Sequence, residues 1–230
     1  MRNVQFIIGS GKCWLAATMG ILLTGLMITA CVAAPSFRGY TGLVIIPTAR
    51  VLDVGEYDFG FMVEDKGISH LNDIFVNYSP KQNLEVGVNA YQPASSDKRK
   101  AVINAKYLLA AETEEAASVA VGVIDLADQV NISPYAVATK SIIRRAKVFG
   151  HSTVSLRGHA GFGFGDIDAL FVGLSAYAGN RVMLSIEYDS HNVNLGFRFT
   201  PIKGLRLHTA ILGSADTDHV GLGISYTKKY

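Results

Sequence analysis

The chain has 230 residues, of which 49% are hydrophobic and 17% charged, with 23 glycines and 6 prolines. This composition is too apolar and too weakly charged for a disordered chain. The formal net charge is +2, and without Arg2 and Lys12 the remaining 21 − 2 = 19 basic residues balance the 19 acidic ones. We therefore expect no nucleic-acid partner. The length suits one domain with a sizeable core or a closed barrel.

The first thirty residues have the order of an export signal. Two basic residues, Arg2 and Lys12, precede an uncharged stretch over 13–30, and small residues follow it. This order of basic, apolar and small residues is typical of exported proteins. We assign residues 1–30 to an export signal and residues 31–230 to a single exported domain. The alternative is a membrane-spanning anchor over 13–30, since that stretch is just long enough to cross a bilayer.

The end of this signal offers two processing sites. Residues 28–31 (Ile-Thr-Ala-Cys) resemble a bacterial lipobox, which predicts that Cys31 is lipidated and begins the mature chain. Cleavage after Ala33 is the competing interpretation. Either way Cys13 is removed, so the exported domain keeps too few cysteines for an internal disulfide and must be stable by other means.

From Tyr40 onward, apolar and polar residues alternate with a period of two, which is typical of strands with one apolar face. Short clusters of Gly, Pro, Asn, Asp and Ser separate these blocks and predict tight turns between antiparallel neighbours. A short segment, Leu43–Pro47, comes first. The predicted strands are Tyr57–Glu64, Asp73–Ser79, Leu84–Tyr91, Ala101–Ala110, Ala117–Asp125, Pro134–Ile143, Thr153–Gly163, Ala169–Ala178, Leu184–Asp189, Val193–Thr200, Leu205–Leu212 and Val220–Thr227.

A meander of this kind has two physical solutions. It can form a soluble sandwich or lipocalin-like barrel with the apolar face inside, or a membrane barrel with that face in lipid. Strand length favours the membrane, because a tilted crossing strand needs about nine to eleven residues. We predict an all-β, antiparallel up-and-down meander that closes into an outer-membrane β-barrel of about ten to twelve strands. The polar inward face then either forms a narrow path or packs on itself as a plug, and in the second case the Leu43–Pro47 segment is expected to lie inside as part of that plug.

In such a barrel the polar faces of the strands line the interior. The candidate lumen-facing residues are Glu85, Asn89, Glu187, Asp189, Asn194, Arg198, Arg206 and His208. Aromatic residues near the predicted strand ends suit girdles at the membrane interfaces; they are Tyr57, Tyr78, Tyr91, Tyr107, Tyr188, Phe199 and Tyr226. Near the C-terminus, Gly221, Ile224 and Tyr226 are spaced like the last-strand insertion signal of bacterial outer-membrane barrels, although four residues follow them.

Two segments resemble the YjbH family of exopolysaccharide and capsule biosynthesis proteins. The first covers 39–50 and continues over 52–57, like the opening of those proteins; the second, 187–199, resembles a recurring acidic, Asn- and Gly-rich strand pair. Together they span about thirty residues, so the chain resembles a single module of longer proteins. The resemblance implies an exported, outer-membrane-associated protein, often a lipoprotein, that serves polysaccharide secretion. It implies no catalytic residues.

Motifs for catalysis or for metal and phosphate binding are weak. Ser190 lies beside His191, but adjacent strand residues point to opposite faces, and there is no Gly-x-Ser-x-Gly elbow. The histidines lack metal-ligand spacing. The Gly-x-Gly-x-Gly stretch over 161–165 is interpreted as a hairpin, because a strand rather than a helix is predicted to follow it. We expect no enzyme activity, cofactor or metal.

The leading hypothesis is a non-enzymatic, accessory or structural outer-membrane component of exopolysaccharide or capsule secretion. The expected partners are outer-membrane lipid, and a surface polysaccharide or other proteins of a secretion locus. The basic runs 98–100 and 144–145 are interpreted as solvated loop or rim charge, with contact to anionic lipid head groups or an acidic polysaccharide as the alternative. The alternative function is a lipid-anchored soluble periplasmic β domain that binds a glycan or a secretion partner.

Overall fold

A computed structural model describes residues 33–66, 69–92, 98–148, 152–214 and 218–230. These residues form twelve strands: β1 (Glu56–Lys66), β2 (Ser69–Lys81), β3 (Leu84–Tyr91), β4 (Lys100–Ala110), β5 (Ser118–Ile124), β6 (Ser133–Val148), β7 (Ser152–Gly163), β8 (Ala169–Ala178), β9 (Val182–Tyr188), β10 (Val193–Phe199), β11 (Leu205–Leu212) and β12 (His219–Lys229). No helix among the described residues is long and apolar enough to span a bilayer. The predicted export signal over 1–30, and Cys31, lie outside the described residues.

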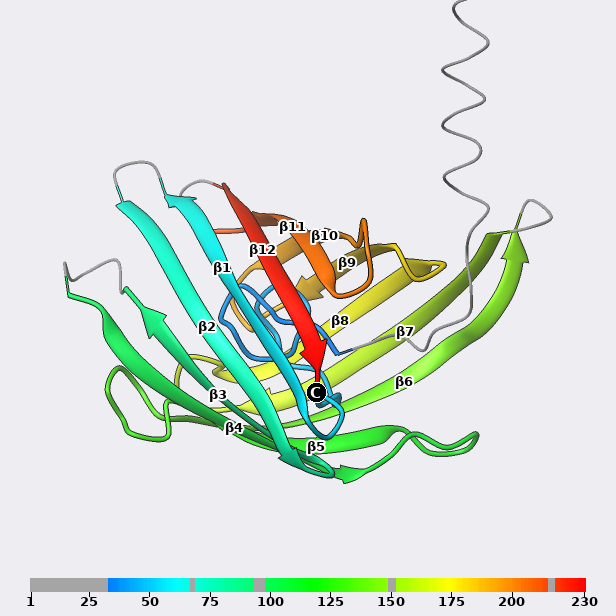
Figure 1. The fold of residues 1–230 in the computed structure, drawn as a ribbon, viewed down its shortest axis with the longest axis horizontal. Coiled ribbons are helices and arrows are strands. Elements are labelled where there is room, and N and C mark those ends of the chain that lie inside the picture. Colours follow the sequence, from blue (N-terminus) through cyan, green and yellow to red (C-terminus); the bar gives the residue numbers. More distant parts are fainter. Residues whose placement is uncertain (1–32, 67–68, 93–97, 149–151, 215–217) are drawn as a thin grey trace, which may run out of the picture. The chain divides into compact units, whose positions relative to one another are not determined.

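The strands pair in chain order, and the first pairs with the last (Figure 1). The register between β1 and β12 runs from Glu56↔Lys229 to Asp65↔Val220. This pairing leaves the ring without an open edge, and it satisfies backbone groups that could not be left unpaired in lipid. The predicted antiparallel up-and-down barrel is confirmed, at the upper end of the expected strand number.

The apolar face of the sheet points outward. Leu195, Phe197 and Ile224 are 46%, 43% and 46% exposed, whereas Glu187 and Arg198 are 2% and 7% exposed. A soluble sandwich or barrel would bury the first set and expose the second. The orientation therefore excludes the soluble alternative and gives the barrel the inverted polarity of a protein surrounded by lipid.

Aromatic side chains gather near both ends of the barrel. We call the end where β1 begins and β12 ends the terminal end, and the opposite end the loop end. At the terminal end, the ring of Tyr57 stacks on Tyr78 with a centroid separation of 4.3 Å and meets Tyr230 edge-on at 5.5 Å. At the loop end, Phe162 and Phe164 pack edge to face at 5.2 Å. These groups fit the interfacial girdles of a membrane barrel.

The other aromatic residues named from the sequence extend these groups. The rings of Phe59 and Tyr226 lie 5.9 Å apart on the paired strands β1 and β12. Tyr107 and Tyr188 are 43% and 41% exposed. Phe199 is half-buried, and the side chain of Tyr91 lies outside the described part.

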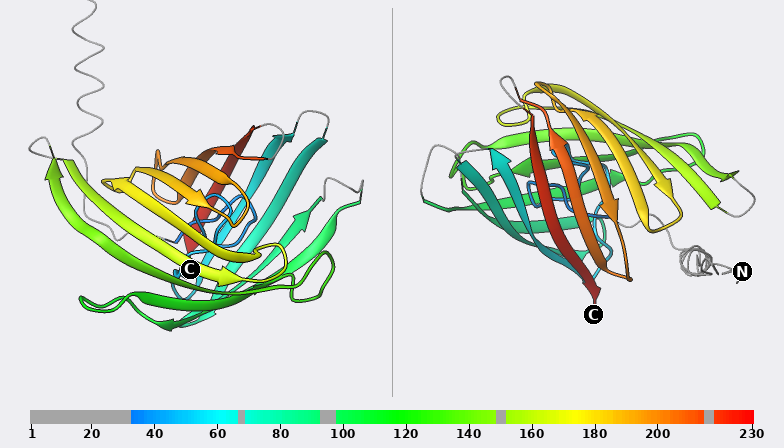
Figure 2. Two further views of the ribbon diagram at one scale, coloured as in Figure 1. Left: turned by 180° about the vertical axis from the view of Figure 1, so that it is seen from behind. Right: turned by 90° about the horizontal axis from the view of Figure 1, so that it is seen from above.

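Residues 33–53, which we call the plug, lie inside the barrel (Figures 1 and 2). The plug has its own small pairings, Pro35↔Thr41 and Gly42↔Pro47. Its buried apolar side chains pack against wall residues in two clusters; they are Phe37, Tyr40, Leu43, Val44, Ile46 and Ala49. The prediction that Leu43–Pro47 lies inside as part of a plug is confirmed, and the plug is longer than that segment.

The glycine-rich stretch over 161–165 ends β7 and begins the turn to β8, as its interpretation as a hairpin predicts. A Cβ on Gly161 would collide with the ring of Phe171, and Gly165 has a φ of +73°, which suits glycine. The stretch therefore serves packing and a turn, and a strand follows it as expected.

Candidate functional site: the plugged lumen

Glu187 on β9 binds the backbone of the plug. Its carboxylate accepts hydrogen bonds from the amides of Val44 at 2.9 Å and Ile45 at 2.6 Å, and longer ones from Ile46 at 3.3 and 3.4 Å. The side-chain amide of Asn194 donates to the same carboxylate at 3.0 Å. Successive backbone N–H groups that converge in this way form an anion-binding nest. Here the anion is a wall side chain, so the nest fixes the plug to β9.

Arg198, on the adjacent strand β10, binds carbonyl oxygens of the plug, whereas Glu187 binds its amides. Its guanidinium donates to the carbonyl oxygens of Pro35 at 2.8 Å and of Gly42 and Leu43 at 3.3 Å each. One guanidinium therefore ties together the start and the middle of the plug. Because all three acceptors are main-chain atoms, this contact fixes the path of the plug rather than its side chains.

A buried ion pair on β3 and β4 holds the middle and end of the plug. Glu85 accepts from the amides of Thr41 at 3.3 Å and Leu52 at 3.0 Å. Lys106 lies 3.9 Å from Glu85 and donates to the carbonyls of Thr41 at 2.6 Å and Arg50 at 3.1 Å. The two charges compensate each other in a site that excludes water, and the plug backbone satisfies their remaining hydrogen bonds.

Further wall groups extend this pattern along the plug. The Arg206 guanidinium donates to the carbonyl of Ala33 at 3.2 Å and lies 3.7 Å from Asp58 on β1. The side-chain amide of Asn89 donates to the Arg38 carbonyl at 2.6 Å, and the Thr139 hydroxyl accepts from the Ala49 amide at 3.0 Å. Strands from all sides of the barrel therefore contact the plug.

The structure places seven of the eight candidate lumen residues on the buried interior face of the wall: Glu85, Asn89, Glu187, Asn194, Arg198, Arg206 and His208. Asp189 differs, because β9 ends at Tyr188 and Asp189 begins the next turn. Its carboxylate accepts from the amides of His191 at 3.1 Å and Asn192 at 2.8 Å, and from the side-chain amide of the interior residue Asn194 at 2.9 Å, so it caps the turn at the rim and borders the lumen.

Sequence reasoning missed several residues that hold the plug. Lys106, Asn77 and Thr139 are all buried on the interior face, and Asn77 donates to the Gly39 carbonyl at 2.5 Å. The signal was present, since each lies on the polar phase of an alternating strand. A lysine among apolar residues is easily assigned to solvent when the partner that buries it is distant in sequence.

Three wall glycines make room for plug side chains, and they also were not predicted. A Cβ on Gly173 would lie 2.8 Å from Ile46 and 2.9 Å from Leu43, and one on Gly196 would lie 2.7 Å from Val44. A Cβ on Gly221 would lie 2.5 Å from the ring of Phe37. These distances are shorter than real Cβ contacts allow, so the wall and the plug are complementary in shape.

Two histidine–serine pairs inside the wall are not arranged for nucleophilic catalysis. His208 Nε2 lies 2.9 Å from the Ser225 hydroxyl, while Arg198 Nε donates to His208 Nδ1 at 3.2 Å. The arginine therefore places the ring proton on Nε2, so the histidine donates to Ser225 and cannot act as its base. The His159–Ser175 pair, at 2.9 Å, is equally buried in the wall.

The serine and histidine singled out from the sequence are not brought together. The Ser190 hydroxyl donates to the Leu170 carbonyl at 2.8 Å, away from His191. His219 lies on β12, with its Nε2 3.5 Å from Glu64. Among the residues that the structure describes, no group of three His, Cys, Asp or Glu side chains could hold a metal ion.

At the terminal end, Glu112 fixes the loop between β4 and β5 to β6. Its carboxylate accepts from the Ser141 amide at 2.9 Å and from the Ser141 hydroxyl at 3.1 Å, and it lies 3.9 Å from Arg157. Partial burial favours a higher pKa for this carboxyl, but the Ser141 hydrogen bonds and the positive charges of Arg157 and Arg144 outweigh it and lower the pKa. The ionised form therefore stabilises the loop.

Comparisons with known proteins give structural neighbours only. Neither a family model nor a curated protein matches the chain. The solved structure of the KdgM porin, alone and in complex with disordered oligogalacturonate, is 12% identical, covers 74% of this chain and 98% of the porin, and has a TM-score of 0.49. An outer membrane channel from Pseudomonas putida F1 is 12% identical, covers 81% of this chain and 100% of the channel, and has a TM-score of 0.35.

The fold itself gives the location. A closed antiparallel barrel with an apolar outer face, aromatic groups near both ends and a polar interior has the architecture of outer-membrane proteins. The chain is an integral β-barrel of the outer membrane, and outer-membrane lipid surrounds its wall.

Proposed function

We propose that the chain is a non-enzymatic, YjbH-type barrel that acts as an accessory or structural component of exopolysaccharide or capsule secretion. The observation that carries the proposal is a contact between the two segments that resemble the YjbH family. Glu187 and Arg198, from the second segment, bind Val44 and Leu43 of the first. Segments far apart in sequence thus form one structural unit, as expected if both belong to one inherited module.

The filled lumen favours an accessory role over a conduit. The plug contributes apolar side chains to both buried clusters. Its backbone also forms hydrogen bonds with wall side chains: its amides donate to residues on β3 and β9, and its carbonyls accept from residues on β4, β10 and β11. A sugar chain could pass only if these contacts broke together. The protein would therefore support a secretion assembly, with the polysaccharide or other proteins of that assembly as its partners.

The experiment is a chromosomal deletion in a strain that secretes the polymer, with surface-bound and cell-retained polysaccharide measured separately. Loss of surface polymer, restored by the wild-type gene, is the expected result. Complementation by the Arg198→Met variant, which loses the plug contacts, should be incomplete although the protein still reaches the outer membrane. Unchanged secretion in the deletion strain would overturn the proposal.

The conduit alternative is tested separately. Purified wild-type protein in planar lipid bilayers should show no steady ion current, because the lumen is occupied. A stable conductance from the wild-type chain would favour a channel instead.

Lipidation of Cys31 is part of the proposal, and cleavage after Ala33 is its competitor. Metabolic labelling with a fatty acid should label the wild type and not the Cys31→Ala variant. The mass of the N-terminal peptide of the mature protein distinguishes the two processing sites.

A further inference from the structure

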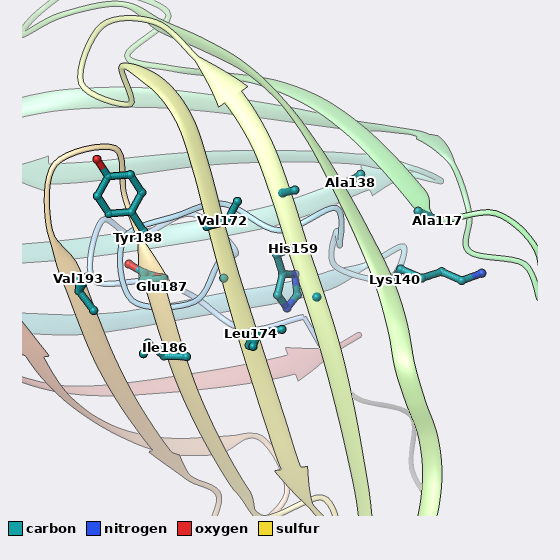
Figure 3. Close-up of a pocket in the computed structure, with 13 residues that line it drawn as sticks. Ala117, Ala138, Lys140, His159, Val172, Leu174, Ile186, Glu187, Tyr188 and Val193 are labelled. Carbon is teal, nitrogen blue, oxygen red and sulfur yellow. The ribbon is translucent and has the colours of Figure 1, made fainter.

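The outer wall carries a groove of about 550 Å³ that the plugged lumen does not explain. It crosses β6 to β10 between two rows of outward-facing residues (Figure 3). One row pairs Ala138 with Ala160, Ala160 with Val172, and Val172 with Tyr188; the other pairs Lys140 with Gly158, Gly158 with Leu174, and Leu174 with Ile186. The wall is recessed where the small residues of β6 and β7 stand beside larger ones of β8 and β9.

The groove presents hydrocarbon and no available polar group among the side chains that line it. The Lys140 amine donates to the carbonyls of Thr113 at 3.1 Å, Glu114 at 2.7 Å and Ala116 at 3.2 Å, and Figure 3 shows this side chain directed away from the other lining residues. The Tyr188 hydroxyl donates to the Ser190 carbonyl at 2.8 Å. His159 and Glu187 point into the barrel and are bonded there. A polar ligand would find no partner.

The dimensions favour a single hydrocarbon chain over a helix. Outward residues on one strand recur about 6.6 Å apart, which is narrower than the roughly 10 Å diameter of a helix with its side chains. The groove crosses five strands, so it is roughly 19 Å long. Its bordering residues belong to the exposed apolar band, with Leu174 43% and Ile186 46% exposed. The groove is therefore narrow and elongated and opens into lipid, and we call it the trench.

Charge gives the trench a direction. On the terminal side, β6 continues beyond Lys140 with the exposed basic residues Arg145 and Lys147, whereas the neighbouring Arg144 donates to the Thr113 carbonyl at 2.7 Å and lies 3.7 Å from Glu114. On the loop side, the trench ends near Tyr188 and Val193, beside the turn that holds Asp189. A phosphate is therefore favoured at the terminal side. From there an acyl chain would run along the trench towards the opposite leaflet.

We propose that this trench is a binding site for one acyl chain of a phospholipid from the leaflet at the terminal end, with the phosphate near Arg145. In outer-membrane barrels the shorter turns face the periplasm. At the terminal end the connections are 82–83, 111–117, 149–151, 179–181 and 200–204, which is 20 residues in five connections. At the loop end they are 67–68, 92–99, 125–132, 164–168, 189–192 and 213–218, which is 33 residues in six, so the turns at the terminal end are shorter on average. The lipid thus comes from the periplasmic leaflet.

The test is native mass spectrometry of the full-length protein, released from detergent after titration with phosphatidylglycerol. The wild type should retain one lipid. Ala160→Leu, which fills the trench, should weaken retention by about tenfold or more. Ala101→Leu, on the exposed outer face of β4, should behave like the wild type. Gly158→Leu is a second filling variant, since its Cβ would meet only the flexible ends of Ile142 and Leu174. Slower mobility after heating, measured on every variant, shows that the barrel has folded.

Equal retention by the wild type and both filling variants would overturn the site. Arg145→Gln should weaken phosphatidylglycerol retention several-fold without changing the fold. If this variant retains the lipid as well as the wild type, the assignment of the phosphate is wrong. Preferential binding of lipid A, the lipid of the outer leaflet, would overturn the choice of leaflet.

Discussion

Glu187 and Arg198, on the paired strands β9 and β10, bind the two kinds of main-chain polar group of the plug: Glu187 binds N–H donors and Arg198 binds carbonyl acceptors. The carboxylate accepts from the amides of Val44 and Ile45, and the guanidinium donates to the carbonyls of Gly42 and Leu43. Two wall side chains of opposite charge on paired strands therefore satisfy consecutive residues of one buried, irregular segment. Without them these main-chain groups would lie in the barrel without water or partners, which is costly.

Replacing Glu187 by Gln should destabilise the protein by about 2–3 kcal/mol, because a charged acceptor of several hydrogen bonds becomes a neutral group with one oxygen. The measurement is the free energy of unfolding in urea, in detergent micelles. Ser185→Ala is the matched control, since Ser185 is buried on the same strand and its hydroxyl has no hydrogen-bond partner among the described residues. An equal effect of both substitutions would contradict the role given to Glu187.

Gly221→Ala should cost about 1–3 kcal/mol, because its Cβ would overlap the Phe37 ring. Phe37→Leu should cost stability by itself through lost packing. The double variant should lose less stability than the two single variants lose together, since the smaller side chain leaves room for the new methyl group. Strict additivity in urea unfolding would show that this glycine does not accommodate Phe37.

Placing a charge on the outer face should impair insertion. Leu195→Arg, at a position 46% exposed on β10, should cost about 2–4 kcal/mol if it lies near the bilayer midplane. Ile202→Arg is the control, since Ile202 is exposed in the turn over 200–204. The fraction folded into lipid vesicles, read from heat-modifiable mobility, should fall for the first variant and not for the second.

The loop over 111–117 should loosen in acid. Glu112 has a lowered pKa in the folded protein, so its contribution to stability is complete above its ordinary pKa and is lost as the pH falls through the lowered value. Exchange of the Ser141 amide should accelerate in that acidic window. Glu112→Gln should remove most of this pH dependence, whereas Glu115→Gln, on an exposed residue of the same loop, should preserve it.

The strands of this barrel could be predicted from sequence because a period of two is a local signal. Blocks such as Val193–Phe199 alternate cleanly, and the structure places their apolar residues outside. The interior positions of the seven buried candidate residues follow from the same alternation once the apolar face is assigned to lipid. The position of Asp189 at the rim, with one carboxylate oxygen on the interior residue Asn194, did not follow, because one residue beyond a strand end the alternation no longer fixes the direction of a side chain.

The plug could be predicted only in part. Residues 33–53 do not alternate, and their conformation depends on partners far along the chain, such as Glu187 for Val44. The wall glycines carry no local signal either, since a glycine on the interior phase of a strand looks the same whether it faces water or a ring such as Phe37. Both features depend on contacts that only the closed barrel creates.

The pairing of Glu56 with Lys229 joins positions 229 − 56 = 173 residues apart. Pairings between residues so far apart in sequence form slowly, so we expect the β1–β12 pairing to form last. Residues 33–53 precede every strand, yet their ligands come from strands spread over the whole chain. The plug must therefore enter the barrel before β1 and β12 pair, or while they do so. Until then the apolar outer wall is exposed, and so are the unpaired edges of β1 and β12, both of which favour aggregation.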